Sequence, residues 1–366
     1  MQITISKSIL AGALSELAPL AGKNKVLPIL SYIKVVTKGN RIRLQATDAE
    51  TTIRKYVEAE SIDQDCEFLV ECAGLNAFIN KIKSDTLKLT LDGSTLTVKH
   101  SKGKASFQTL SAEDFVEVKQ DDNAVEFSLP ASKFAEFISI AKNFVSFDDY
   151  RPQMKPIRAL IEDGTLTVCA TDTRKMFVDS VDVVGEIPDV QWFIEPSVFV
   201  FVANACKGAD FVSIKASENS VSYRIGATTI FSKQTQGKYP DFRRVIPKEH
   251  LIDVEFNKTE AIDAIQRALL FTEDSRMIQI GVTSMAIEVK GENLTKLSKA
   301  AETFTCSSNA DIIFGANASS FLDGLKACET TNIKMELYDA SRPIVFKDAD
   351  NTRRVVIVMP MIVGKV

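Results

Sequence analysis

The most constraining feature of this 366-residue chain is a strand pattern that runs directly into a helical pattern, because it occurs three times. The copies begin near residues 2, 125 and 252. Alternating apolar residues predict each strand, and apolar spacings of three and four predict each helix. The helical stripes are Ile9, Leu10, Leu14 and Leu17; Phe134, Phe137, Ile138 and Ala141; and Ile262, Ile265 and Leu269. Ser6 is expected to cap the first helix, and Pro130 suits the first turn of its counterpart in the second copy.

Each copy has a second half with the order strand, helix, hairpin. The strand and helix are predicted within residues 66–85, 191–210 and 310–329, and the hairpin within 87–100, 211–225 and 332–348. The run VFVFV at 198–202 is also compatible with a strand. Two helices, many alternating strands and no long parallel crossover predict an α+β fold with helices packed on antiparallel sheets.

A shared tripeptide supports the repeat. ATD occurs at 46–48 and at 170–172, each time at the end of an apolar run, while VKGEN at 289–293 stands in its place in the third copy. Asp48 and Asp172 are equivalent positions of two repeats, so we expect turn or capping roles for them rather than a catalytic carboxylate pair. The repeat of roughly 120 residues predicts three domains, 1–121, 124–247 and 251–366, and a curved array of such units tends to close with a second copy.

Composition places the chain among globular proteins. Hydrophobic residues make up 45% of it, and it has neither an apolar run of membrane-spanning length nor a signal-peptide pattern, so we expect a cytoplasmic protein. The six cysteines form no CxxC pair and are expected to be buried free thiols. The net charge of -4 gives no general attraction to nucleic acid.

No catalytic or metal-binding set can be recognised. His100 and His250 have no companions at a telling spacing and are expected to be surface histidines. AGKN at 21–24 lacks both the first glycine and the Ser or Thr of a phosphate-binding loop. An enzyme is therefore not expected.

Basic residues accompany every predicted helix. They are Lys7; Lys81 and Lys83; Lys133 and Lys142; Lys207; Arg267; and Lys326. Each alone is most simply a solvated helix face. Six helices together indicate a common basic side, which would attract phosphates without reading bases.

The segment GKYPDFRRVIP at 237–247 resembles a signature of the bacterial DNA polymerase III beta subunit family, the replicative sliding clamps. Further matches follow in the family's order: VLPILSYI at 26–33, LQATDAETTI at 44–53, GKASFQTLSAEDF at 103–115, VCATDTRKMF at 168–177 and VVIVMPMIV at 355–363. The resemblance covers essentially the whole chain. It implies a head-to-tail homodimeric ring of six domains that encircles duplex DNA, with helices lining the hole, and tethers the polymerase.

The resemblance implies partners and no cofactor. The partners are double-stranded DNA, bound without sequence preference, the polymerase III alpha subunit, a clamp loader and other proteins with a clamp-binding peptide. The peptide pocket would be lined by Met154, Thr171, Arg174, Met176, Pro240, Arg244, Val245, Ile357, Val358, Met359, Pro360 and Met361. The chain departs from the family pattern in Thr173 and Arg174 after ATD and in the ending MPMIVGKV, and both departures bear on the pocket.

The resemblance also suggests DNA contacts and a dimer seam. The DNA-binding candidates are Lys23, Lys25, Lys81, Lys83, Lys142, Arg151, Lys155 and Lys207. The seam would pair Phe107 with Leu270 and Phe271. Two alternatives remain in view: a non-replicative peptide-binding scaffold of the same repeat, and a hydrolase, which would need carboxylates or histidines that converge in one pocket.

Overall fold

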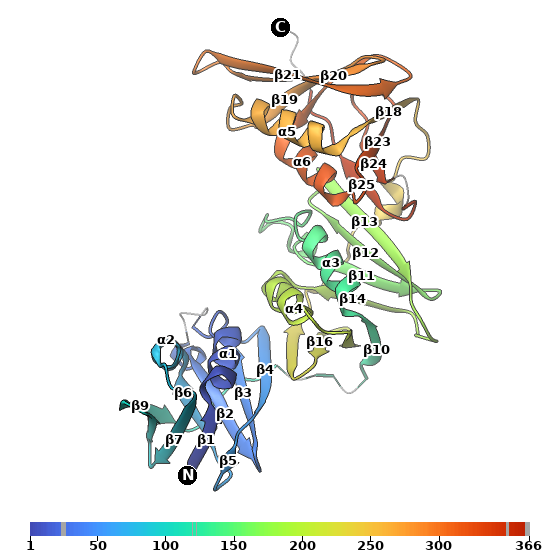
Figure 1. Cartoon of the computed structure of the whole chain (residues 1–366). Helices are drawn as coiled ribbons and strands as arrows, with labels where there is room; N and C mark the ends of the chain where they lie inside the picture. The colour runs from blue at the N-terminus through green and yellow to red at the C-terminus, as the bar shows by residue number, and fades with distance from the viewer. Residues whose placement is uncertain (23–26, 119, 122, 349–350, 363–366) are drawn as a thin grey trace. The chain divides into compact units, whose positions relative to one another are not determined.

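The computed structural model describes residues 1–22, 27–118, 120–121, 123–348 and 351–362. Figure 1 shows the helices and strands of these residues. The residues divide into two compact units. The first unit comprises residues 1–136 and 197–234, and the second comprises residues 137–196 and 235–366. This division differs from the three predicted domains because each unit follows one continuous sheet.

The first unit is built on a 13-stranded sheet in which every neighbouring pair is antiparallel. The strands in spatial order are β10 (Val125–Pro130), β15 (Phe211–Ala216), β16 (Ser220–Ile225), β17 (Thr228–Lys233), β4 (Thr51–Glu58), β3 (Arg41–Thr47), β2 (Tyr32–Lys38), β6 (Glu67–Glu71), β9 (Gly103–Leu110), β8 (Thr95–His100), β7 (Thr86–Asp92), β1 (Gln2–Ser6) and β5 (Ser61–Ile62). Helices α1 (Lys7–Leu17) and α2 (Cys72–Lys81) pack on each other and on this sheet, and α4 (Phe199–Ala205) packs on β17.

The second unit is built on a 12-stranded antiparallel sheet. Its strands in spatial order are β14 (Val190–Ile194), β11 (Ile157–Glu162), β12 (Thr165–Thr171), β13 (Lys175–Asp182), β25 (Val355–Val358), β24 (Ile344–Asp348), β23 (Asn332–Leu337), β18 (Ile252–Asn257), β21 (Ser298–Ser308), β20 (Ala286–Asn293), β19 (Met277–Val282) and β22 (Ile312–Asn317). Helices α5 (Lys258–Leu269) and α6 (Ala318–Ala327) pack together, α5 on β20 and β21 and α6 on β25. Helix α3 (Ala131–Ala141) spans the boundary between the units.

The predicted α+β architecture is confirmed, including all three strand-to-helix copies. The stripe of α3 is fully buried, and so are Leu10, Leu14 and Leu17 of α1. The run VFVFV contributes to η3 (Pro196–Val198) and α4 and forms no strand. In α4, Phe199 and Val202 are buried one turn apart while Val200 is 62% exposed, which is the pattern of a helix.

Four predicted details were wrong or only half right. Ile9 is 44% exposed, because Leu10 and Leu14 already fill the side of α1 that faces the sheet. Ser6 holds the N-cap position without a side-chain cap, since its Oγ lies 3.0 Å from Ser8 Oγ. Pro130 ends β10 and does not enter the first helical turn. In α5, Ile262 and Leu269 are only half-buried, and alanines fill most of the buried face.

The three repeats are joined by antiparallel pairing between one strand type and another. In the first half of each repeat, the first helix is followed by a meander of three antiparallel strands. The third meander strands of the three repeats are β4, β13 and β21, and the last strands of their second halves are β9, β17 and β25. The last strand of the second repeat, β17, pairs with β4 of the first, from Thr228↔Lys55 to Ser232↔Thr51. The last strand of the third repeat, β25, pairs with β13 of the second.

The six cysteines are free thiols, as predicted. Cys72, Cys169, Cys206 and Cys328 are buried, whereas Cys66 and Cys306 are half-buried. Burial raises the pKa of Cys72, Cys169 and Cys328 to about 12 and that of Cys206 to about 11. These groups therefore remain protonated and poorly nucleophilic near neutral pH.

Candidate functional site

The two ATD segments form the same turn. Asp172 Oδ1 accepts hydrogen bonds from the backbone N–H groups of Arg174 and Lys175, both at 2.8 Å. Asp48 Oδ1 does the same for the N–H groups of Glu50 and Thr51, at 3.1 and 2.7 Å. The next residue after each aspartate has a positive φ, 76° at Ala49 and 78° at Thr173. The predicted turn role of both aspartates is confirmed.

The preceding threonine completes each turn. Thr171 Oγ1 donates to the Lys175 carbonyl oxygen at 2.9 Å and accepts the Thr173 N–H at 3.1 Å. Thr47 Oγ1 makes the corresponding bonds to Thr51 and Ala49. Both hydroxyls are buried, so the hairpin ends are rigidly defined. In the second repeat the turn sets where β13 begins.

The β13–β25 pair brings the second ATD segment to the C-terminal MPM segment. Met176 is the cross-strand partner of Ile357, and Lys175 is the partner of Val358. The Met359 N–H donates to the Arg174 carbonyl oxygen at 2.7 Å, which extends the ladder past the end of β25. Residues more than 180 positions apart in sequence are thereby adjacent.

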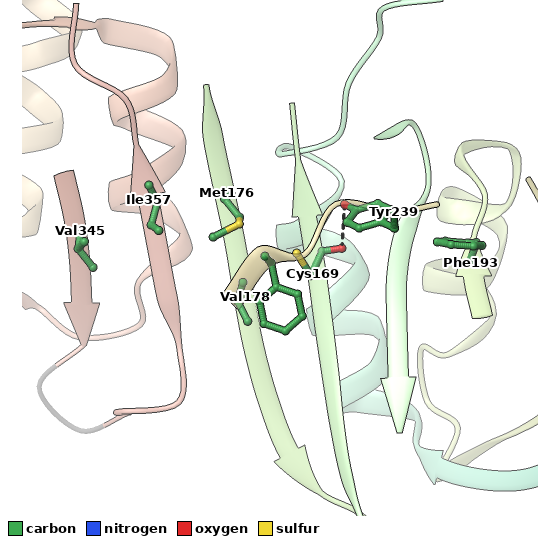
Figure 2. Packing of buried hydrophobic residues seen from close by; sticks show 8 residues of the cluster. Cys169, Met176, Val178, Phe193, Tyr239, Val345 and Ile357 are labelled. Carbon is green, nitrogen blue, oxygen red and sulfur yellow. Dashed lines mark hydrogen bonds between the residues drawn. The ribbon is translucent and has the colours of Figure 1, made fainter. Parts of the chain in front are cut away.

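An apolar cluster lies across this junction. Figure 2 shows its members on the neighbouring strands β24, β25, β13 and β12, on β14, and on the segment that follows β17. The buried members are Cys169, Met176, Val178, Phe193, Tyr239, Phe242, Val345 and Ile357, with Ile246 and Val355 packed against them. Tyr239 donates its hydroxyl hydrogen to the Cys169 carbonyl oxygen at 3.4 Å, and burial raises the pKa of Tyr239 above its ordinary value. The cluster ties the 239–246 segment to the strands.

The twelve predicted pocket residues differ in exposure. Thr171, Met176, Ile357 and Val358 are buried; Met154, Pro240, Met359, Pro360 and Met361 are half-buried; and Arg174, Arg244 and Val245 are exposed. Thr171, Met176 and Ile357 are cross-strand partners on one face and can form a floor, whereas Val358 points to the other face, toward Gly324 of α6. Met361 lies against β22 rather than β13, since its N–H donates to the Gly315 carbonyl oxygen at 2.8 Å. Met154 ends the short helix η2 (Pro152–Met154).

A groove of about 790 Å³ adjoins this cluster, and sequence reasoning found only part of it. Arg244 and Val245 line it, as does Val345 of the buried cluster. Its other wall comes from the loop between β23 and β24, where the Arg342 guanidinium lies 3.8 Å from the centroid of the Tyr338 ring. No motif in the sequence marks that loop.

A buried arginine holds the same junction. Arg354, just before β25, is 1% exposed and donates from Nε to Asp179 Oδ2 of β13 at 2.8 Å. Its Nη1 donates to the Ala327 carbonyl oxygen at the end of α6 at 3.0 Å, and its Nη2 lies 2.7 Å from Glu329 Oε1. Asp179 is fully buried, so its ion pair with Arg354 is shielded from water.

The basic residues proposed for DNA occupy helix ends. Lys81 is the last residue of α2, and Lys142 and Lys207 follow α3 and α4 within two residues. All are exposed, and a cation at a helix C-terminus is stabilised by the helix dipole. Lys83 is exposed just beyond the C-cap of α2. Lys23 and Lys25 lie outside the described residues.

The remaining basic candidates have local partners. Arg151 donates to Thr173 Oγ1 at 2.9 Å, and Lys155 pairs with Asp149. Two helix cations named from the sequence are also paired: Lys133 with Glu136, and Arg267 with Glu302 at 2.8 Å. Their charge is partly compensated, so they contribute less to the predicted basic side than unpaired cations would.

One cluster was missed from the sequence. His250, Asp253 and Glu336 place possible ligand atoms within 4.8 Å of one another. Lys334 lies 3.0 Å from Asp253, and Lys347 lies 2.7 Å from Glu336, so lysine ammonium groups already neutralise these carboxylates. The cluster is better described as an ion-pair network. His250 was expected to stand alone because Glu336 is 86 positions away in sequence.

The predicted seam residues lie on two edges. Phe107 of β9 packs edge-on against Phe78 of α2, with ring centroids 5.9 Å apart. Leu270, directly after α5, is 81% exposed, and Phe271 is half-buried.

Within the described part of the chain, no helix is long and apolar enough to cross a membrane.

Comparison with known proteins agrees with this architecture. The model for the N-terminal domain of the DNA polymerase III beta subunit matches residues 1–119, and the model for its C-terminal domain matches residues 243–362. The beta sliding clamp of Pseudomonas aeruginosa is 25% identical over 365 residues, which covers 99% of this chain and 100% of that protein. The Escherichia coli beta sliding clamp is 23% identical, again over 99% of this chain and 100% of that protein.

Solved structures share the fold. The crystal structure of the Pseudomonas aeruginosa DNA polymerase III subunit beta has a TM-score of 0.94 at 24% identity, and covers 99% of this chain and all of that one. The Bacillus subtilis sliding clamp has a TM-score of 0.93 at 18% identity, with 99% and 100% covered. The repeated two-helix units on antiparallel sheets are thus the sliding-clamp fold. Two domain models of one protein together match about two thirds of the sequence, and the chain belongs to the DNA polymerase III beta subunit family.

The Arg354 network predicts a large stability difference between adjacent arginines. Arg354→Ala should lower the free energy of unfolding of the second unit by about 3–5 kcal/mol, because it removes the guanidinium that compensates the buried Asp179 carboxylate. The control Arg353→Ala breaks an exposed pair with Asp182 and should cost less than about 1 kcal/mol. Urea unfolding followed by fluorescence of Trp192, which is the sole tryptophan of the chain and lies buried in this unit, measures both. Equal effects of the two variants would contradict the assignment.

Proposed function

We propose that the chain is a sliding clamp that forms a head-to-tail homodimeric ring around duplex DNA and tethers the replicative polymerase. One observation carries the proposal. Both junctions between the three repeats are made by pairing the last strand of one repeat with the third meander strand of the repeat before it, and one strand of each type is left over. A second copy of the chain can supply a pairing partner for each of these two strands.

The leftover strands are β9 and β21. Within the described residues, 103–108 of β9 pair only with β8, and 298–305 of β21 pair only with β20. A long unpaired strand edge is a template for another chain. β9 of one copy on β21 of the next repeats the junction made by β17 with β4 and by β25 with β13. Because the two surfaces differ, the contact is head-to-tail, and two such contacts close a ring.

Apolar side chains flank these edges. Phe107 belongs to β9, and Leu270 and Phe271 follow α5, which packs on β21. A leucine with 81% of its surface exposed is a liability in an isolated copy. Burial of these three side chains at the seam is the role that the resemblance assigns to them.

DNA is held by enclosure in this proposal, and the contacts stay weak. The exposed lysines 81, 83, 142 and 207, together with Arg151 and Lys155, supply point charges that attract phosphates without reading bases. A net charge of -4 leaves the rest of the surface unattractive to DNA. Weak contacts permit sliding, and closure prevents escape.

Protein partners are proposed to dock as short peptides on the β13–β25 junction. The buried floor of Met176 and Ile357 is bordered by exposed Val245 and Arg244 and by half-buried methionines, which adapt to different side chains. The DNA polymerase III alpha subunit and the clamp loader are the partners that the family suggests. The role is non-catalytic and needs no cofactor of its own, and it belongs in the cytoplasm, where bacterial DNA is replicated. The three domains 1–121, 124–247 and 251–366 remain part of this proposal.

The seam makes a mass prediction. The wild-type chain should have about twice its 40.3 kDa mass in solution, and Phe107→Asp should reduce it to the mass of a single chain, because a carboxylate at the seam would be buried without a partner. Phe147→Asp is the control, since Phe147 is 85% exposed and lies on neither leftover strand. Light scattering after size exclusion measures all three. A dimer that persists in Phe107→Asp would place the seam elsewhere.

The junction makes a peptide-binding prediction. A chain that ends at Met359 loses the bridge of Met361 to Gly315 and one side of the pocket, so the affinity for a polymerase alpha subunit peptide should fall at least about ten-fold. A chain that ends at Ile362 keeps both and is the control. Fluorescence anisotropy with the labelled peptide gives the affinities, and thermal unfolding checks that both chains fold. Unchanged affinity after the shorter truncation would show that the peptide binds elsewhere.

A further inference from the structure

A second pocket, unrelated to the proposed peptide site, lies on the sheet of the first unit. It has a volume of about 410 Å³, within the range of small-molecule sites. It is formed over β15, β16, β17 and β4, where the second repeat joins the first. Cross-strand pairing sets Ser213, Arg224, Thr229 and Arg54 in one row across these four strands.

The row faces away from the helices. Direct cross-strand partners point to the same face of a sheet, and successive residues of one strand point to opposite faces. Ile214, Tyr223 and Ile230 alternate with the row and are 0–1% exposed, with Phe134 of α3 packed on the Tyr223 ring. The polar residues of the pocket therefore lie on the opposite, solvent-facing side.

The lining of this pocket is cationic. Arg54, Lys215 and Arg224 line it together with the hydroxyls of Ser213, Ser222 and Thr229, and no carboxylate is among the lining residues described. Such a combination of guanidinium, ammonium and hydroxyl donors offers hydrogen bonds to an oxyanion, although the Ser213 hydroxyl already donates to Glu126 Oε1 at 3.3 Å. In a chain of net charge -4, this concentration of donors in one hollow is distinctive.

Two of the three cations are held in place. The Arg54 guanidinium lies 4.4 Å from the centroid of the Phe231 ring, its Nε donates to Gln45 Oε1 at 2.8 Å, and its Nη2 donates to Glu117 at 3.0 Å. Lys215 lies 2.9 Å from Glu126. These partners fix Arg54 and Lys215 in position and partly neutralise their charge. The two cations would therefore orient a bound ligand more than attract it.

Arg224 is the cation left for a ligand. Within the described part of the chain it forms no ion pair, and its side chain is exposed at the centre of the row. The pKa of the neighbouring Glu126 carboxyl is lowered mainly by its hydrogen bond from Lys215 and to a lesser degree by the Arg224 charge. Tyr56, 37% exposed at the edge of the pocket, adds an aromatic surface. Planar guanidinium groups match phosphate oxygens in two-pronged hydrogen bonds, and an aromatic face accepts a planar base.

We propose that this pocket binds the phosphate of a nucleotide, with its oxygens on the Arg224 guanidinium and on the Thr229 hydroxyl, and its base against Tyr56. The phosphate can belong to a free nucleotide or to a single-stranded nucleic acid. The pocket is on the face opposite to the helices of its own sheet. Its occupation does not depend on the proposed ring or on the proposed peptide site.

Equilibrium dialysis of the full chain against thymidine 5′-monophosphate and against thymidine tests the proposal. The monophosphate should bind at millimolar concentrations or below, and thymidine, which lacks the charged group, should bind at least about ten-fold more weakly. Arg224→Gln should weaken monophosphate binding by about ten-fold or more, since it removes a charge-assisted contact. Arg353→Gln removes the same charge outside the pocket and should leave binding unchanged.

The outcomes separate cleanly. Equal binding of thymidine and its monophosphate, no binding of either, or an Arg224→Gln chain that binds like the wild type would each overturn the proposal. A short oligothymidylate distinguishes the sources of the phosphate. Binding that is tighter than that of the monophosphate and sensitive to Arg224→Gln identifies a single strand as the ligand, whereas monophosphate binding alone identifies a free nucleotide.

Discussion

Antiparallel pairing between repeats is the interaction on which the rest of this structure depends. A repeat that ended in its own sheet would leave two exposed edges, whereas β17 on β4 and β25 on β13 convert those edges into continuous ladders of 13 and 12 strands. Backbone hydrogen bonds carry these junctions, so they tolerate wide sequence change. That tolerance fits relatives that share the fold at 18–25% identity.

The same pairing builds both sites discussed for this chain. At β13–β25 it places the turn of the second ATD segment beside the end of β25. Side chains from β13, from β25 and from the 239–246 segment pack there in one apolar cluster. At β17–β4 it sets Arg54 of the first repeat in line with Thr229 and Arg224 of the second. Neither surface exists within a single repeat. A buried guanidinium, that of Arg354, reinforces the first junction because α6, β13 and β25 all depend on it for charge or hydrogen bonding.

Local sequence signals predicted the elements well and the surfaces less well. The two ATD turns could be anticipated because Asp and Thr side chains bond their own neighbours, and no distant residue is needed. The strand-to-helix copies were recognisable for the same reason. Exposure was harder: Met176 and Ile357 were predicted to line a pocket, and their burial in one cluster with Tyr239 and Phe242, which are remote in sequence, could not be read from local patterns. The wall formed by Tyr338 and Arg342, and the partnership of His250 with Glu336, depend wholly on tertiary pairing and left no pattern to read.

Enclosure, rather than affinity, is the central physical claim about function, and topology tests it most directly. The chain is loaded on nicked circular DNA by a compatible clamp loader with ATP, purified away from free protein, and the fraction retained on the DNA is measured before and after a single-site cut. The account predicts stable retention on the circle and rapid loss from the free ends once the DNA is linear. Equal retention on both forms, or equal loss from both, would contradict it.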